Sequence, residues 1–113
     1  MDTRKKIITG VDAARLAAQG ATLVSGYFDP LLASHAARLS ELKRGTLIVA
    51  IENPARPILD ARARAEMVAS LKMVDYVVES TDGLAPAVRL EQEDERRRDQ
   101  LIAHVHLRQQ GAS

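Results

Sequence analysis

Short apolar runs alternate with amphipathic segments along most of this 113-residue chain. Three of the runs are short and partly β-branched, which is typical of buried strands. They are residues 22–28, 46–51 and 74–80. The segments between them carry apolar residues at helical spacing, most clearly Leu31, His35, Leu39 and Leu42. This alternation predicts right-handed crossovers and a mainly parallel sheet.

Capping residues mark the first and third predicted helices. Thr9 and Asp12 resemble a capping pair for a helix over about residues 10–19, which Gly20 would end. Asp60 can cap the third helix. A weaker run at about residues 85–90, interrupted by proline and arginine, predicts a short fourth strand.

The stretch from the first predicted strand to the second predicted helix is the strongest candidate for a functional site. A strand ending in Gly26 can turn sharply, and a helix just beyond it aims its unpaired N–H groups at one point above the sheet, where phosphate binds readily. The helix lies within residues 30–43 and has two possible starts. Either Asp29 is the cap with Pro30 in the first position, or Ser34 is the cap.

We therefore expect one domain over residues 1–113, with an α/β core at 1–90 and a C-terminal helix at 91–113. The fold class is α/β, a Rossmann-like three-layer α/β/α sandwich on a mainly parallel sheet of four or five strands. The charged residues of the first half of the last helix are interpreted as a solvated face. Its second half has a narrow apolar face, formed by Leu101, Ile102 and Val105, that packs against a partner or frays.

Composition narrows the possible partners. Sixteen Lys and Arg against fifteen Asp and Glu give a formal charge of +1, so no global field favours nucleic acid or anionic lipid. The chain has no cysteine, and no apolar run approaches the roughly 20 residues of a membrane-spanning helix, so we expect a cytoplasmic protein without a membrane partner. His104 and His106 are two residues apart, which does not place them on one helical face, so no metal site is expected.

Two segments resemble a known family. GYFDPLLASH, residues 26–35, resembles the GxFDxxHxGH signature of cytidylyltransferase-like nucleotidyltransferases, and RPILDARARAEMVASLKMVDYVV, residues 56–78, resembles the stretch after their second strand. The likeness covers about residues 5–90 and is greatest to the adenylyltransferase domain of the heptose-phosphate kinase/adenylyltransferase. It implies that CTP or ATP lies across the strand ends with Mg²⁺, that an acceptor phosphate attacks the α-phosphorus and releases pyrophosphate, and that the protein is a homodimer.

The resemblance assigns roles residue by residue. His35 stands at the second histidine of the signature and would be the catalytic residue. The residues implied in nucleotide binding are Gly26, Tyr27, Phe28, Asp29, Ser34, Lys43 and Arg64. Leu32 replaces the first histidine, and Ser34 replaces the glycine that lets the backbone approach the phosphates. Ala63 replaces the glutamate beside Arg64, and the closing serine/threonine-rich motif is missing.

His35, Asp29 and the arginines of the third predicted helix region also have a purely structural interpretation. His35 either contacts a triphosphate or is a half-buried histidine hydrogen-bonded to backbone, and the sequence supports both equally. An Asp-Pro helix start accounts for Asp29. Arg56, Arg62 and Arg64 either form an anion cradle or, as we favour, lie on the wet face of their helix, where Arg62 can pair with Glu66.

Two functions follow. The departures from the signature favour a degenerate domain with weak or no catalysis that serves as a binding or oligomerisation module. The retained turn and His35 support the alternative, an active nucleotidyltransferase that transfers a nucleotidyl group from CTP or ATP to a phosphorylated sugar, polyol or similar small acceptor, with Mg²⁺ as cofactor.

Overall fold

The strands form one parallel sheet in the order β3-β2-β1-β4, and the computed structural model describes residues 3–96. The strands are β1 (Thr22–Gly26), β2 (Leu47–Ile51), β3 (Tyr76–Val78) and β4 (Val88–Arg89). The helices are the 3-10 helix η1 (Thr3–Lys6), then α1 (Gly10–Ala18), α2 (Ala33–Leu42) and α3 (Ala61–Ala69), and residues 90–96 are again helical. The predicted α/β, Rossmann-like fold is confirmed, with four strands.

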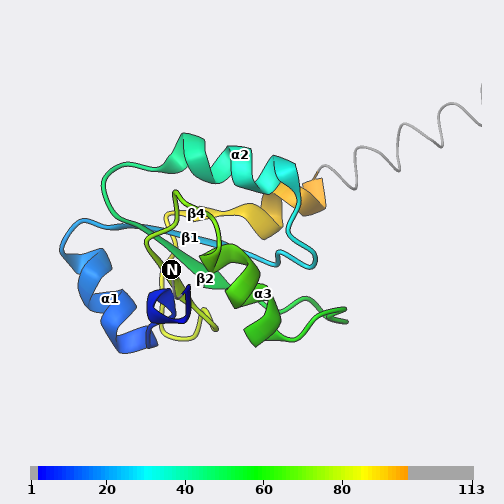
Figure 1. The fold of residues 1–113 in the computed structure, drawn as a ribbon, viewed down its shortest axis with the longest axis horizontal. Coiled ribbons are helices and arrows are strands. Elements are labelled where there is room, and N and C mark those ends of the chain that lie inside the picture. Colours follow the sequence, from blue (N-terminus) through cyan, green and yellow to red (C-terminus); the bar gives the residue numbers. More distant parts are fainter. Residues whose placement is uncertain (1–2, 97–113) are drawn as a thin grey trace, which may run out of the picture.

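Helices cover both faces of the sheet (Figure 1). On one face, strand side chains pack with Leu39 of α2 and with Ala65 and Val68 of α3. These strand residues are Val24, Leu47, Val49, Ile51 and Val77. On the other face, the strand residues that alternate with these in the sequence pack around Ala13 of α1. They are Leu23, Ile48, Ala50 and Val78. Because every residue of β2 is buried, this strand reads as a continuous apolar run.

The order of the strands creates a switch point beside β1. The chain moves from β1 through α2 to β2 and through α3 to β3, always in one direction. It then returns to place β4 on the other side of β1, and Leu84 of this connection packs on the face that α1 covers. The strand order therefore reverses beside β1, and the carboxyl ends of strands at such a switch point are where α/β folds bind ligands.

The caps of α1 and α3 are as predicted, but that of α2 is not. Thr9 Oγ1 accepts the N–H of Asp12 at 3.2 Å, and Asp60 Oδ1 accepts that of Ala63 at 2.7 Å. Both predicted starts of α2 are wrong, because the helix begins at Ala33 with Leu32 as its N-cap. Instead, the imidazole of His35 accepts the Leu32 N–H at this end of α2.

The acidic residues after β4 correct a second prediction in part. Glu95 and Arg96 are exposed, as expected of a solvated face, but the carboxylates before them are not. Within residues 90–96, Leu90 and Glu91 are buried, and Glu93 and Asp94 are half-buried against α2. In Figure 1 this orange segment lies beside the beginning of α2. The rest of the predicted C-terminal helix falls outside the described residues, as do Leu101, Ile102, Val105, His104 and His106. Within residues 3–96, no helix is long and apolar enough to cross a membrane.

Candidate functional site

A pocket of about 640 Å³ lies where β1 ends and α2 begins, at the switch point of the sheet. Three stretches of chain line it, namely the β1–α2 connection, the loop after β2, and the helical segment 90–96. The lining residues are Tyr27, Phe28, Asp29, Pro30, Leu32, Ser34, His35, Pro54, Ala55, Arg56, Ile58, Asp94 and Glu95. Five of the eight residues that the resemblance implicates, Tyr27, Phe28, Asp29, Ser34 and His35, are therefore brought together.

The turn after β1 requires the glycine at its start. Phe28 has a φ of +50°, which folds its buried ring back over Gly26. A Cβ atom at Gly26 would lie 2.6 Å from two carbons of that ring, so no larger residue fits without moving the aromatic side chain. The ring also meets the imidazole of His35 edge-on, with centroids 5.4 Å apart. The glycine turn and the imidazole thus lie together at the strand ends, as the sequence predicted.

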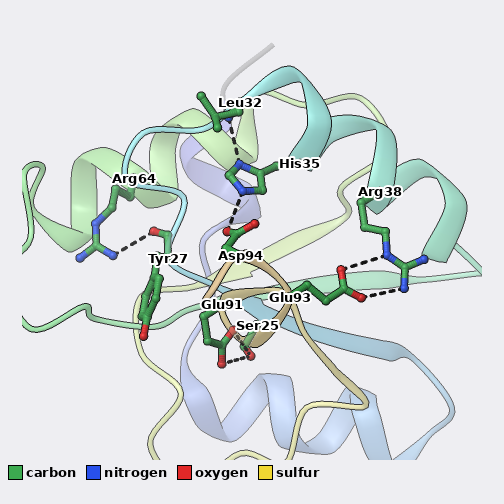
Figure 2. A network of polar contacts seen from close by, with 9 residues as sticks. All are labelled: Ser25, Tyr27, Leu32, His35, Arg38, Arg64, Glu91, Glu93 and Asp94. Atoms are coloured by element: carbon green, nitrogen blue, oxygen red, sulfur yellow. Dashed lines mark hydrogen bonds and ion pairs between the residues drawn. The ribbon is translucent and has the colours of Figure 1, made fainter. Parts of the chain in front are cut away.

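Both ring nitrogens of His35 have partners (Figure 2). Nδ1 accepts the backbone N–H of Leu32 at 3.1 Å, so the ring hydrogen of the neutral imidazole lies on Nε2. Nε2 lies 2.8 Å from Oδ2 of Asp94 and donates this hydrogen to it. His35 is buried, and its contact with Leu32 satisfies an N–H at the start of α2. The imidazole therefore supports the helix on one side and holds a carboxylate on the other.

Asp29 joins the turn after β1 to the loop after β2. Its two carboxylate oxygens accept the backbone N–H groups of Ile58, at 2.6 Å, and Leu59, at 2.8 Å. The hydrogen bond from Ile58 is the main reason why the pKa of Asp29 is lowered from its usual value. This carboxylate therefore links two walls of the pocket. Because both of its oxygens accept these N–H groups, it does not cap α2.

Arg64 corrects the prediction made for the three arginines, because it is buried and does not lie on the wet face of α3. The residue is 1% exposed, and its guanidinium points to the backbone of Tyr27 (Figure 2). Nη1 donates to the carbonyl oxygens of Tyr27 and Glu52 at 3.0 and 2.8 Å. Nε donates to the carbonyl of Leu59 at 3.0 Å, and Nη2 to Oδ1 of Asn53 at 2.6 Å. The guanidinium thus ties together the chain segments that follow β1 and β2.

The other two arginines lie elsewhere. Arg62 is on the wet face of α3, as predicted, and pairs with Glu66 and Glu79. Arg56 lies on the pocket wall, is exposed, and has no hydrogen bond or ion pair with any residue between 3 and 96. Among the described residues, Arg56 is therefore the arginine of this group that has donors free for a ligand in the pocket.

Lys43 lies away from the pocket, at the opposite edge of the sheet. Its Nζ donates to Oδ2 of Asp75 at 2.7 Å, and the same oxygen accepts the N–H of Leu47, the first residue of β2. Although burial, the largest single influence, favours the neutral acid, these hydrogen bonds lower the pKa of Asp75 from its usual value. Lys43 therefore fastens α2 to the amino ends of the strands.

Exposed apolar side chains form part of the pocket lining. Leu32, which replaces the first histidine of the signature, is 52% exposed, and Ile58 is 79% exposed. Both line the pocket, together with Pro30 and Pro54. A ligand with an apolar portion next to a charged or polar one would fit a pocket that is lined in this way.

Four acidic side chains after β4 were missed as part of the site. Tyr27 donates its hydroxyl hydrogen to Oε1 of Glu95 at 2.8 Å, and this hydrogen bond is the main reason why its pKa is raised to about 12. Two of the other contacts are formed by residues earlier in the segment. Arg38 of α2 donates to both oxygens of Glu93 at 3.2 and 2.9 Å, and Ser25 of β1 lies 2.8 and 2.9 Å from the two oxygens of buried Glu91. The sequence signal was only a dense run of acids.

No family model, curated protein or solved structure matches the chain. Within the described residues, no group of three histidine, cysteine, aspartate or glutamate side chains could hold a metal ion. The class that fold and site define is a Rossmann-like α/β domain with a ligand-sized pocket at its switch point.

Proposed function

We propose that the chain is a nucleotidyltransferase-like domain that binds a small phosphorylated ligand, such as a nucleoside triphosphate, with weak or no catalysis. The observation that carries this proposal is the commitment of both ring nitrogens of His35, in a pocket at the switch point, to partners within the protein. The position of the pocket at the switch point supports ligand binding. The imidazole of His35 argues against catalysis, because both its nitrogens are hydrogen-bonded within the protein.

The donors around the pocket support a ligand with an anionic group. Arg56 has no partner in the part of the chain that is described, and the first turn of α2 presents Ser34 and the positive end of the helix dipole to the pocket. Tyr27 and His35 add an O–H and an N–H donor, both now bonded to carboxylates. Each of these donors can bind a phosphate oxygen instead, provided that its carboxylate moves away.

The same residues argue against efficient nucleotidyl transfer. Leu32 supplies no donor where the resembling family has a histidine, and loss of one well-placed transition-state donor typically reduces the rate about 10²- to 10³-fold. Arg64, one of the two cations that the resemblance implies, is buried and donates to four backbone carbonyls. Mg²⁺ would arrive with the triphosphate, since its phosphates are the usual ligands of that ion.

Binding is tested by titrating the four ribonucleoside triphosphates with Mg²⁺ by calorimetry. We expect saturable binding of at least one, weakened about tenfold in Arg56→Ala because a charge-assisted contact is lost. The matched control is Arg44→Ala, which removes the same charge at the other edge of the sheet and should bind as the wild type does. Absence of binding to the wild type and to Asp94→Ala, which removes the carboxylate bonded to His35, would refute the proposal.

Catalysis is tested by measuring pyrophosphate release from CTP and ATP with a phosphorylated sugar or polyol as acceptor. We expect no release above that of His35→Ala. Turnover at about 1 s⁻¹ or more that depends on His35 would instead establish the alternative, an active nucleotidyltransferase. The homodimer stays a prediction, and sedimentation of a monomer at high concentration would count against it.

A further inference from the structure

We infer that residues 90–96 regulate the pocket from within the chain, with Asp94 and Glu95 holding the donors that an anionic ligand needs. The ligand and this helical segment then compete for one set of hydrogen bonds. The inference rests on the proposed function, because it concerns the affinity of the same pocket. It adds that the closed arrangement is the low-affinity state.

The contacts of the segment follow one rule. Each of its four described carboxylates meets a donor on β1, α2 or the turn between them, and Figure 2 shows these pairs apart from the one with Glu95. The pairs are Ser25 with Glu91, Tyr27 with Glu95, His35 with Asp94, and Arg38 with Glu93. Oδ2 of Asp94, at 2.8 Å from Nε2 of His35, shows where an anionic oxygen fits. A phosphate oxygen could take this place.

The charges of the closed pocket oppose such a ligand. Asp29, Asp94 and Glu95 line it, against the single guanidinium of Arg56. Because charges of equal sign a few ångströms apart repel in a partly buried site, a phosphate group binds poorly while Asp94 and Glu95 remain. The carboxylate of Asp29 is held by two backbone N–H groups and stays, whereas the other two belong to the helical segment.

Burial along the segment shows how it could open. Leu90 and Glu91 are buried, and Glu91 is joined to Ser25 of β1, so the first residues are fixed to the core. Asp94 has a side chain that is 31% exposed, and Glu95 is exposed. Contacts near the surface contribute little to stability, so the outer residues can leave while Leu90 and Glu91 stay in place.

The test compares the affinities of the wild type, Asp94→Ala and Asp94→Asn for CTP, ATP and inorganic pyrophosphate at one pH and ionic strength. We expect Asp94→Ala to bind at least one probe about tenfold more tightly, because the competing carboxylate is gone. Asp94→Asn, whose amide oxygen can still accept from His35, should lie between them and covers the case in which the alanine variant fails to fold. Glu66→Ala, which removes a surface carboxylate of α3, should match the wild type.

The outcomes separate this inference from the function beneath it. If the wild type binds a probe and neither Asp94 variant binds it more tightly, the pocket is a binding site and the inference is overturned. If no probe binds to the wild type or to either variant, the proposed function fails, and the inference fails with it. A gain that Glu66→Ala shares equally would reflect net charge alone and would also overturn it.

Discussion

Two polar networks meet at the carboxyl ends of the strands, and they differ in the charge that each one buries. Arg64 is a buried cation whose partners are neutral carbonyl and amide oxygens. The segment 90–96 brings anions to the donors of β1 and α2, and most of these contacts are half-exposed. A buried network leaves unpaired groups when it is cut, whereas water replaces a half-exposed one. The contacts of Arg64 should therefore be essential for stability, whereas the half-exposed contacts of the segment 90–96 can be broken at little cost.

The largest effect is expected for Arg64→Lys. An ammonium group has three donors at one point and cannot span the carbonyls of Tyr27, Glu52 and Leu59, so buried oxygens lose their partners. We expect the free energy of unfolding, measured by urea denaturation, to fall by about 3 kcal/mol. Arg62→Lys on the exposed face of the same helix is the matched control and should change it by less than about 0.5 kcal/mol.

Equal stability of the two arginine variants would contradict the comparison. It would mean that the guanidinium of Arg64 is not the tie between the segments after β1 and β2. A fall confined to Arg64→Lys would identify it as structural, which would leave Arg56 as the pocket arginine.

The anchored end of the helical segment should show an intermediate effect. Ser25→Ala removes the hydroxyl that lies 2.8 Å from the buried carboxylate of Glu91. Since a buried charge then loses a donor, we expect the free energy of unfolding to fall by about 2 kcal/mol. In the double variant Ser25→Ala/Glu91→Gln the loss should be smaller than the sum of the single losses, which a double-mutant cycle would measure. Strict additivity would show that the two side chains do not interact.

Much of the fold could be predicted because its signals are local. The apolar runs of β1 and β2, and the caps Thr9 and Asp60, act within a few residues of the elements that they define. The start of α2 could not be predicted in this way. Its local cap candidate, Asp29, instead accepts N–H groups of Ile58 and Leu59, which are 29 and 30 residues away in the chain.

The candidate site shows the same limit more strongly. The turn at Gly26 and the position of His35 could be predicted from a strand followed by a helix. The partner of His35 is 59 residues away, and that of Tyr27 is 68 residues away, on a segment whose acidic composition suggests a solvated face. A charged residue on a helix is normally exposed, so the burial of Arg64 also depends on carbonyls that only the tertiary structure provides.

The smallest effect concerns the outer end of the segment and appears only at high pH. The hydrogen bond to Glu95 raises the pKa of Tyr27 to about 12, above its usual 10.0. Between these values the unfolded chain loses the phenolic proton while the folded chain keeps it, so the free energy of unfolding falls as pH rises. The contribution is present below pH 10 and is less than about 1 kcal/mol, because the contact is near the surface. Tyr27→Phe should lack this decline, and urea denaturation at several pH values would measure it against the wild type. Parallel pH dependences of the two proteins would mean that Glu95 does not close on Tyr27, and that the segment covers the pocket through Asp94 alone.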